Sequence, residues 1–285
     1  LSLDRRFFTS TAHYRITLNN LQGDSGPESR ELLLVDHIEH GPLPWSHLKA
    51  FRLMPVMAAS NFELERNADT QAWFAMSRNQ SPLRGQVSLG YDGASDTRLQ
   101  LLPLDAREGN DTVRFSGLNA RLTLSADASR YSLTGQSDEL LADIEGQAGR
   151  QGAEVAPVRV ENLSASGLMQ EVEGNLDVQA SYSVGALNYA SRPVGALQMS
   201  VKLANLDIAA SREFGNLYQT IIAPQWQTPL PDGSLPPLRL TPAERRQLEA
   251  VVGTLLNAKP QLQLERLSLA TEHGESHLSM TAQLA

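Results

Sequence analysis

Three histidines that lie close together are the first candidates for a chemical site. His37, His40 and His47 could bind zinc only if three or four such ligands converged in a tetrahedron. If residues 32–40 form a strand, the odd separation of His37 and His40 places them on opposite faces of it. We therefore predict structural roles for these histidines and no metal site.

The sequence motifs of common enzymes are missing. There is no Gly-x-Ser-x-Gly nucleophile elbow, no Gly-x-x-x-x-Gly-Lys-Ser/Thr phosphate loop and no dinucleotide-binding glycine pattern. The chain has no cysteine, which excludes thiolate nucleophiles, disulfides and Cys-ligated metals. Acid pairs such as Asp138 and Glu139 fall in predicted turns or on polar strand faces, whereas a catalytic pair belongs in a cleft. We predict a protein that is not an enzyme and that holds no cofactor.

Length and charge narrow the class of protein further. With 285 residues the chain is long enough to bury a substantial core, in one large domain or two modest ones. A formal net charge of −8 opposes general binding to nucleic acid and to anionic lipid head groups, because like charges repel. No run of about 18 apolar residues is present that would span a bilayer as a helix.

The elements that must position any site are mostly strands. Apolar and polar residues alternate in many short runs, which is typical of strands with one sheltered face. Short polar turns such as Asp92-Gly93 separate these runs and favour antiparallel pairing. We predict a mainly β (α+β) fold, a long antiparallel β-meander forming a curved sheet or groove, covered in part by two or three helices. The clearest strand runs are 14–18, 120–125, 131–134, 176–182, 197–203 and 278–284.

The strongest helix signal covers residues 241–258. Thr241 is expected at the N-cap, Pro242 at the first helical position, and Glu244 completes a capping box. Apolar residues then recur at helical spacing and predict one buried face.

Two weaker helices are predicted elsewhere in the chain. One covers residues 208–223 and is expected to end at Pro224. The other covers residues 45–59, where Pro55 would kink or break it.

The domain organisation is predicted as a single elongated domain over residues 1–285. Residues 147–152 form a flexible connection and the softest boundary, but the strand pattern resumes on both sides. Residues 224–237 contain five prolines and indicate an extended loop between two helices.

The segment from His37 to Trp45 is the most distinctive short motif of the sequence. Gly41-Pro42 ends the strand that carries His40, and Pro44 restricts Leu43 to extended geometry. The segment is either a rigid strand-to-helix corner, with His40 bonded to nearby backbone, or a binding site. We favour the corner, so His40, Gly41 and Pro42 are predicted as a structural motif.

The run His40-Gly41-Pro42-Leu43-Pro44, followed by Leu48-Lys49, resembles the hallmark of the YdgA-like proteins, a bacterial family of unknown function. The resemblance implies a protein of the Gram-negative envelope, with its bulk in the periplasm and one N-terminal helix in the inner membrane. No such helix is present here, so we expect the anchor to precede Leu1 in the full-length protein. The family has no established catalytic residues. Further similarities lie at residues 53–59, 81–83, 102–104, 115–118, 259–262 and 271–275, and so extend over essentially the whole chain.

The first functional hypothesis is a domain that binds an apolar or amphipathic envelope ligand, such as a lipid. The layout of strand after strand is similar to AsmA-like proteins, whose sheets form grooves that hold acyl chains; that similarity is one of architecture. An open groove and a closed core packed by the helices both fit the pattern. The predicted lining is aliphatic and one-sided: Leu122, Leu124, Leu133, Leu176, Val178, Leu197, Met199 and Val201.

The alternative hypothesis is a structural or scaffolding protein of the envelope. It would form a homodimer or pair with another envelope protein through strand edges and the proline-rich loop. Trp226 in that loop is the predicted interaction residue, because tryptophan is enriched at interface hot spots. Packing of Trp226 against a helix is the other interpretation.

Overall fold

The computed structural model describes residues 2–5, 8–23, 26–49, 51, 55–108, 111–143, 157–226 and 236–284. The predicted connection at 147–152 and most of the proline-rich segment lie outside the described residues. The chain divides into two compact units. Unit 1 comprises Leu1–Gly167, Ser181–Gln198 and Ser268–His277, and unit 2 comprises Leu168–Ala180, Met199–Leu267 and Leu278–Ala285.

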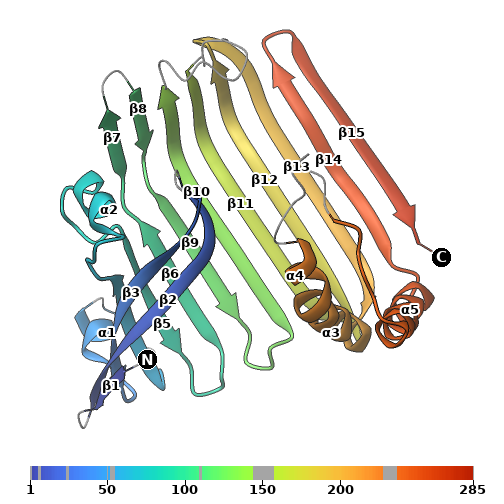
Figure 1. The fold of residues 1–285 in the computed structure, drawn as a ribbon, viewed down its shortest axis with the longest axis horizontal. Helices are drawn as coiled ribbons and strands as arrows, with labels where there is room; N and C mark the ends of the chain where they lie inside the picture. Colours follow the sequence, from blue (N-terminus) through green and yellow to red (C-terminus); the bar gives the residue numbers. More distant parts are fainter. Residues whose placement is uncertain are drawn as a thin grey trace. The chain divides into compact units, whose positions relative to one another are not determined.

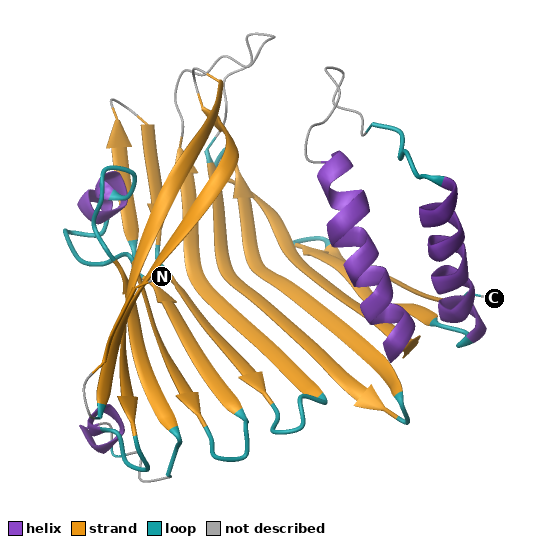
Figure 2. Cartoon of the chain, turned by 60° about the horizontal axis from the view of Figure 1, so that its bottom comes forward, coloured by secondary structure: helices purple, strands orange, loops and turns teal. Residues whose placement is uncertain are grey.

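Antiparallel strands make up most of the described chain, and helices are few (Figures 1 and 2). Hydrogen bonds join neighbouring strands in the order β1-β2-β3-β4-β5-β6-β9-β10-β11-β12-β13-β14-β15. The prediction of a mainly β chain built as a long antiparallel meander is confirmed. The strands are β1 (Ser2–Arg5), β2 (Thr9–Gly23), β3 (Gly26–His40), β4 (Ala58–Leu64), β5 (Leu83–Leu89), β6 (Ser95–Leu101), β7 (Leu104–Glu108), β8 (Asp111–Phe115), β9 (Leu118–Leu124), β10 (Arg130–Asp143), β11 (Val158–Val172), β12 (Asn175–Tyr189), β13 (Arg192–Asp207), β14 (Gln261–Thr271) and β15 (Gly274–Gln283).

Strand β10 is long enough to pair with two shorter strands. Its first part pairs with β9 and its last residues pair with β8, which also pairs with β7. Between β8 and β9 the backbone of Gly117 has a φ of +100°, and a Cβ there would press on the carbonyl oxygen of Leu101. Glycine is therefore required where the chain passes from β8 to β9. The short hairpin of β7 and β8 leaves β9 free to pair with β6.

The strand registers of unit 1 sort its side chains onto two faces, because successive residues of a strand point to opposite sides. One face carries two polar rows that run across the strands from β2 to β10. The first polar row is Thr11, His37, Asn61, Gln86, Arg98, Arg121 and Thr134. The second polar row is His13, Val35, Glu63, Arg84, Gln100, Asn119 and Gln136. The apolar face carries the alternate residues, among them Tyr14, Ile16, Leu34, Phe62, Val87, Leu99, Leu122, Leu124 and Leu133.

The first predicted helix is much shorter than expected. Helix α1 covers only Trp45–Lys49, and Ala58–Leu64 forms strand β4 between β3 and β5. The prediction of a helix over residues 45–59 is therefore wrong at residue 51 and over residues 55–59, while residues 50 and 52–54 lie outside the described residues. Pro55 interrupts helical hydrogen bonding, and pairing on both sides then secures the strand. A further helix, α2 (Gln71–Met76), buries Phe74.

Unit 2 contains the longer helices. Helix α3 (Ile208–Leu217) runs into a π-helical turn, η1 (Tyr218–Ile222), and then α4 (Ala223–Trp226). Pro224 was expected to end this helix, but the chain stays helical to Trp226. The π-turn accounts for the difference, because its shifted bonding changes which carbonyl the proline ring would meet.

The helix predicted over residues 241–258 is confirmed as α5 (Pro242–Asn257). Thr241 caps it, and the reciprocal bonds of a capping box join Thr241 and Glu244. Helices α3 and α5 lie side by side, and Ala210, Leu217 and Val251 form their buried contact (Figure 2). No described helix is both long enough and apolar enough to cross a bilayer.

Candidate functional site

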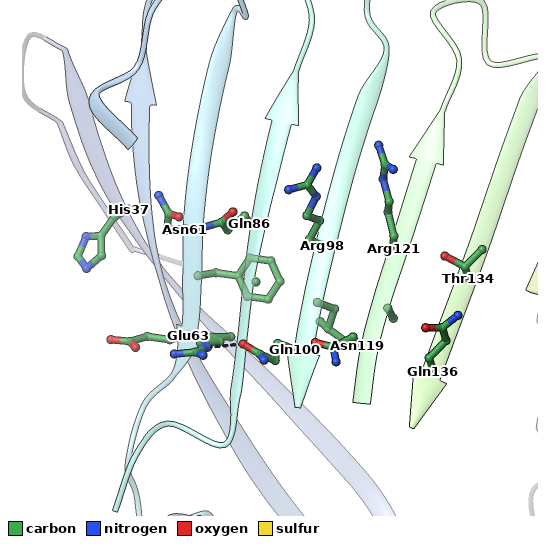
Figure 3. Close-up of a pocket in the computed structure, with 15 residues that line it drawn as sticks. His37, Asn61, Glu63, Gln86, Arg98, Gln100, Asn119, Arg121, Thr134 and Gln136 are labelled. Carbon is green, nitrogen blue, oxygen red and sulfur yellow. Dashed lines mark hydrogen bonds between the residues drawn. The ribbon is translucent and has the colours of Figure 1, made fainter. Parts of the chain in front are cut away.

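A broad hollow lies between the two polar rows of unit 1 (Figure 3). It has a volume of about 770 Å³, which is in the range of small-molecule sites. Phe62, Leu99 and Ala120 also border it, but alternation points their side chains to the apolar face. The floor between the rows is therefore main chain. The remaining lining is His37, Asn61, Glu63, Arg84, Gly85, Gln86, Arg98, Gln100, Asn119, Arg121, Thr134 and Gln136.

Arginines dominate the charge of this hollow. Arg121 donates through Nε and an Nη atom to both carboxylate oxygens of Asp96, at 2.9 and 3.0 Å. These bonds raise the pKa of Arg121 above its ordinary value. Arg98 lies 3.6 Å from the same carboxylate. Arg84 of β5 donates to Oε1 of Gln100 in β6 at 2.8 Å (dashed line in Figure 3). The hollow is thus locally cationic in a chain whose net charge is −8.

Sequence reasoning missed these arginines. Each occupies a polar position of an alternating strand, so its face was predictable. What placed Arg98 beside Arg121 was the pairing of β6 with β9 across an intervening hairpin. A search for basic residues at alternating positions would have found the candidates, but not their partners.

Three of the leucines predicted to line a ligand groove, in β9 and β10, lie on the other side of these strands. Leu122 and Leu133 are direct cross-strand partners on the apolar face, with Leu124 beside them. Leu197 belongs to unit 1 in strand β13. The four other predicted residues belong to unit 2, in β12 and β13: Leu176, Val178, Met199 and Val201. Whether these residues line one groove stays a prediction.

The His40-Gly41-Pro42 segment is a strand-to-helix corner. The amide of His40 donates to the carbonyl of Phe8 at 2.8 Å, and a hydrogen bond of 2.9 Å joins its Nε2 to Oγ of Ser10. Gly41 has a φ of +118°, and its amide donates to the carbonyl of Met57. Pro42 accepts from the amide of Val56 at 3.1 Å, so both ends of the loop are tied together. A hollow of about 320 Å³ borders the corner.

The three clustered histidines have separate partners. His40 bonds to Ser10, whereas His37 lies 3.3 Å from Oγ1 of Thr11, which points to the opposite face. His47 of α1 is buried and bonded to Ser88 at 2.9 Å. The predicted placement of His37 and His40 on opposite faces is therefore confirmed. Among the described residues, no three His, Cys, Asp or Glu side chains are grouped to hold a metal ion.

Trp226 lies in unit 2 and is partly buried. Its ring meets the ring of Tyr218 edge-on, with centroids 6.5 Å apart. Its indole nitrogen donates to the carbonyl of Pro236 at 3.3 Å. Gln225 next to it bonds to the main chain of Arg239 in both directions. These bonds hold the main chain of Pro236 and Arg239, which lie shortly before α5. The predicted interface role of Trp226 stays a prediction.

Asp36 is a buried carboxylate on the apolar face. Only 9% of the residue is exposed, and Oδ1 has no hydrogen-bond partner among the described residues. Its cross-strand neighbours are Ala12 and Phe62. Burial raises the pKa of Asp36, and a hydrogen bond with Ser60 opposes the rise only in part.

We expect the variant Asp36→Asn to be more stable than the unchanged protein at pH 7. The raised pKa means that the folded state favours the protonated acid, so the stability this group provides is lost as pH rises through its folded pKa. A neutral amide avoids that loss and should raise Tm by a few degrees. Thermal melts between pH 3 and 7 would test this. The gain should vanish below the ordinary pKa of 3.8, and a gain that persists there would contradict the cause.

Comparison with known proteins places the chain in a family. A family model described as "Bacterial protein of unknown function (DUF945)" matches residues 1–148 and 142–285. Protein YdgA of Escherichia coli (strain K12) is 22% identical over 317 residues, which cover 95% of this chain and 62% of YdgA. The uncharacterized protein YihF of the same organism is 29% identical over 132 residues, which cover 46% of this chain and 26% of YihF.

No solved structure matches the chain. The chain spans less than two thirds of the length of both curated relatives. The two family matches together extend over the whole sequence and confirm the resemblance expected from its motifs. The chain belongs to the DUF945 family of bacterial proteins of unknown function.

Proposed function

We propose that this chain is a non-catalytic domain of the bacterial periplasm that binds an amphipathic ligand, such as a lipid, through the apolar face of unit 1. In the full-length protein, a segment outside this sequence would anchor it to the inner membrane. One observation carries the proposal: large apolar side chains on this face remain open to solvent.

The exposed side chains lie in the middle of strands, where neighbouring strands cover part of each. Tyr14, Ile16 and Leu18 in β2 are 38%, 42% and 38% exposed, and Leu133 in β10 is 41% exposed. Apolar area in water costs about 25 cal/mol per Å², so a ligand that covers it gains free energy. Exposed apolar side chains that gather on one face of a monomer are typical of binding surfaces.

The chemistry of the face favours an acyl chain. Leu99, Leu122, Leu124 and Leu133 are aliphatic and lie on three adjacent strands. They offer contact area along the sheet without a polar group that would need a partner. A ligand whose head group remains in water and whose tail lies on these leucines fits this arrangement.

We expect the variant Leu133→Asp to lose lipid that co-purifies with the unchanged protein. A carboxylate in the middle of the face would have to lose its hydration under a bound chain, which is costly. Ser132→Asp is the matched control, because this substitution adds the same charge on the opposite face of the same strand. Native mass spectrometry, followed by solvent extraction and lipid analysis, would measure the bound lipid.

Near-stoichiometric lipid in the unchanged protein and in Ser132→Asp, but not in folded Leu133→Asp, would support the proposal. A lipid-free spectrum with a discrete dimer, and no lipid uptake on incubation, would overturn it in favour of scaffolding. Equal amounts of bound lipid in both variants would show that the lipid binds elsewhere than on this face.

A further inference from the structure

We propose that the hollow between the two polar rows is a separate binding site for an anionic polyol, such as a glycan segment that carries carboxylate or phosphate groups. It lies on the opposite face of the sheet from the proposed lipid surface, so either proposal can fail while the other holds. Three features of the hollow carry this inference.

The first feature is a pair of like charges. Arg98 in β6 and Arg121 in β9 are direct cross-strand partners on the same face. Like charges directly opposite each other destabilise a sheet. Asp96 compensates, but it forms its two-point contact with Arg121 and only a 3.6 Å contact with Arg98. One guanidinium therefore keeps most of its bonding capacity for an anion in the hollow.

The second feature is a set of five carboxamides around the arginines. Each offers donors and an acceptor, which matches a hydroxyl group that both gives and takes a hydrogen bond. In the described part of the chain, Gln100 alone of the five forms a hydrogen bond through its side-chain carboxamide, with Arg84. The five are Asn61, Gln86, Gln100, Asn119 and Gln136.

The third feature is the geometry of the hollow. Residues two apart on a strand are roughly 7 Å apart, and neighbouring strands are about 4.8 Å apart. The two polar rows therefore flank a channel that crosses the strands, with main chain as its floor. An extended ligand lying along this channel would meet a new pair of polar side chains at each of the strands β4, β5, β6, β9 and β10.

The positive charge is concentrated in one part of the hollow. Arg98 in β6 and Arg121 in β9 are neighbours there, whereas Glu63 of β4 has Arg84 of β5 as its direct cross-strand partner. Phe62 points to the opposite face, so its ring is turned away from the hollow and cannot stack on a sugar there. Recognition would depend on hydrogen bonds and charge, and binding should weaken as salt increases.

The test measures binding of a soluble oligogalacturonate, which is an anionic polyol, against neutral maltohexaose and inorganic phosphate. Isothermal titration calorimetry at low salt should give at least tenfold tighter binding of oligogalacturonate than of either other probe. Arg98→Gln should weaken that binding about tenfold, because it removes the less compensated charge and leaves the Arg121–Asp96 pair intact.

Arg130→Gln is the matched control. Arg130 begins β10 on the same face but does not border the hollow, so this variant should bind like the unchanged protein. Gln86→Ala provides a second variant that leaves all charges in place and should also weaken binding.

Equal weakening by Arg98→Gln and Arg130→Gln would overturn the site in favour of general charge attraction. Phosphate that binds as tightly as oligogalacturonate would show an anion site without polyol recognition. No binding of any probe at millimolar concentration would also refute the inference. Leu133→Asp should leave this binding unchanged, which separates it from failure of the lipid proposal.

Discussion

Replacing Leu64 by alanine is expected to destabilise unit 1 by about 2–5 kcal/mol. Leu64 ends strand β4 and is 2% exposed, one of the most buried large side chains in the described chain. Leu64 and buried Phe74 of α2 both border one hollow of unit 1. The carbonyl of Leu64 accepts a hydrogen bond from Oγ of Ser81. Removing the side chain leaves a cavity that the paired strands around it can close only in part.

The chain allows this loss to be measured on unit 1 separately. Of its three tryptophans, Trp45 and Trp73 belong to unit 1 and Trp226 to unit 2. In a Trp226→Phe background, fluorescence during urea unfolding therefore reports on unit 1. Leu133→Ala is the matched control, because Leu133 is 41% exposed and should lose less than half as much. Equal losses at the two positions would show that Leu64 is not the better packed residue.

The strands were predictable because each has one sheltered and one exposed face. Residues 14–18, 120–125 and 131–134 alternate for that reason and lie in β2, β9 and β10. The helix that begins after Thr241 was predictable from its capping residues, whose bonds are local. Ala58 and Ala59 gave no such signal, and only pairing with β3 and β5 makes them part of a strand.

The candidate site depends on information that alternation does not contain. Alternation places Arg98 and Arg121 at polar positions of their strands, but it does not predict that they are cross-strand partners. Their contact requires β9 to pair with β6 after the chain has formed the β7–β8 hairpin. A shift of one residue in that register would turn one arginine to the apolar face. The polar hollow is therefore a product of pairing register and interrupted strands.

Gly195 in β13 is the second position where a small change should have a large effect. Its φ is +135°, a conformation that side chains of L-residues rarely adopt. A Cβ built at this position would run into the carbonyl oxygen of Ala270 in β14, which belongs to the same unit. Main chain cannot turn aside as a flexible side chain can. The close approach of β13 and β14 at this point therefore depends on glycine.

We expect Gly195→Ala to destabilise unit 1 at the upper end of about 1–3 kcal/mol, because backbone strain adds to the collision. The same substitution at Gly253 in α5 is the control with the opposite sign. A Cβ there meets nothing within 4 Å, and alanine should stabilise the helix by about 0.5–1 kcal/mol. Urea unfolding, followed through Trp45 and Trp73 for Gly195→Ala and through Trp226 for Gly253→Ala, would compare them. An unchanged midpoint for Gly195→Ala would mean that β13 and β14 separate at no cost, and the strand pairing at this point would then contribute nothing to stability.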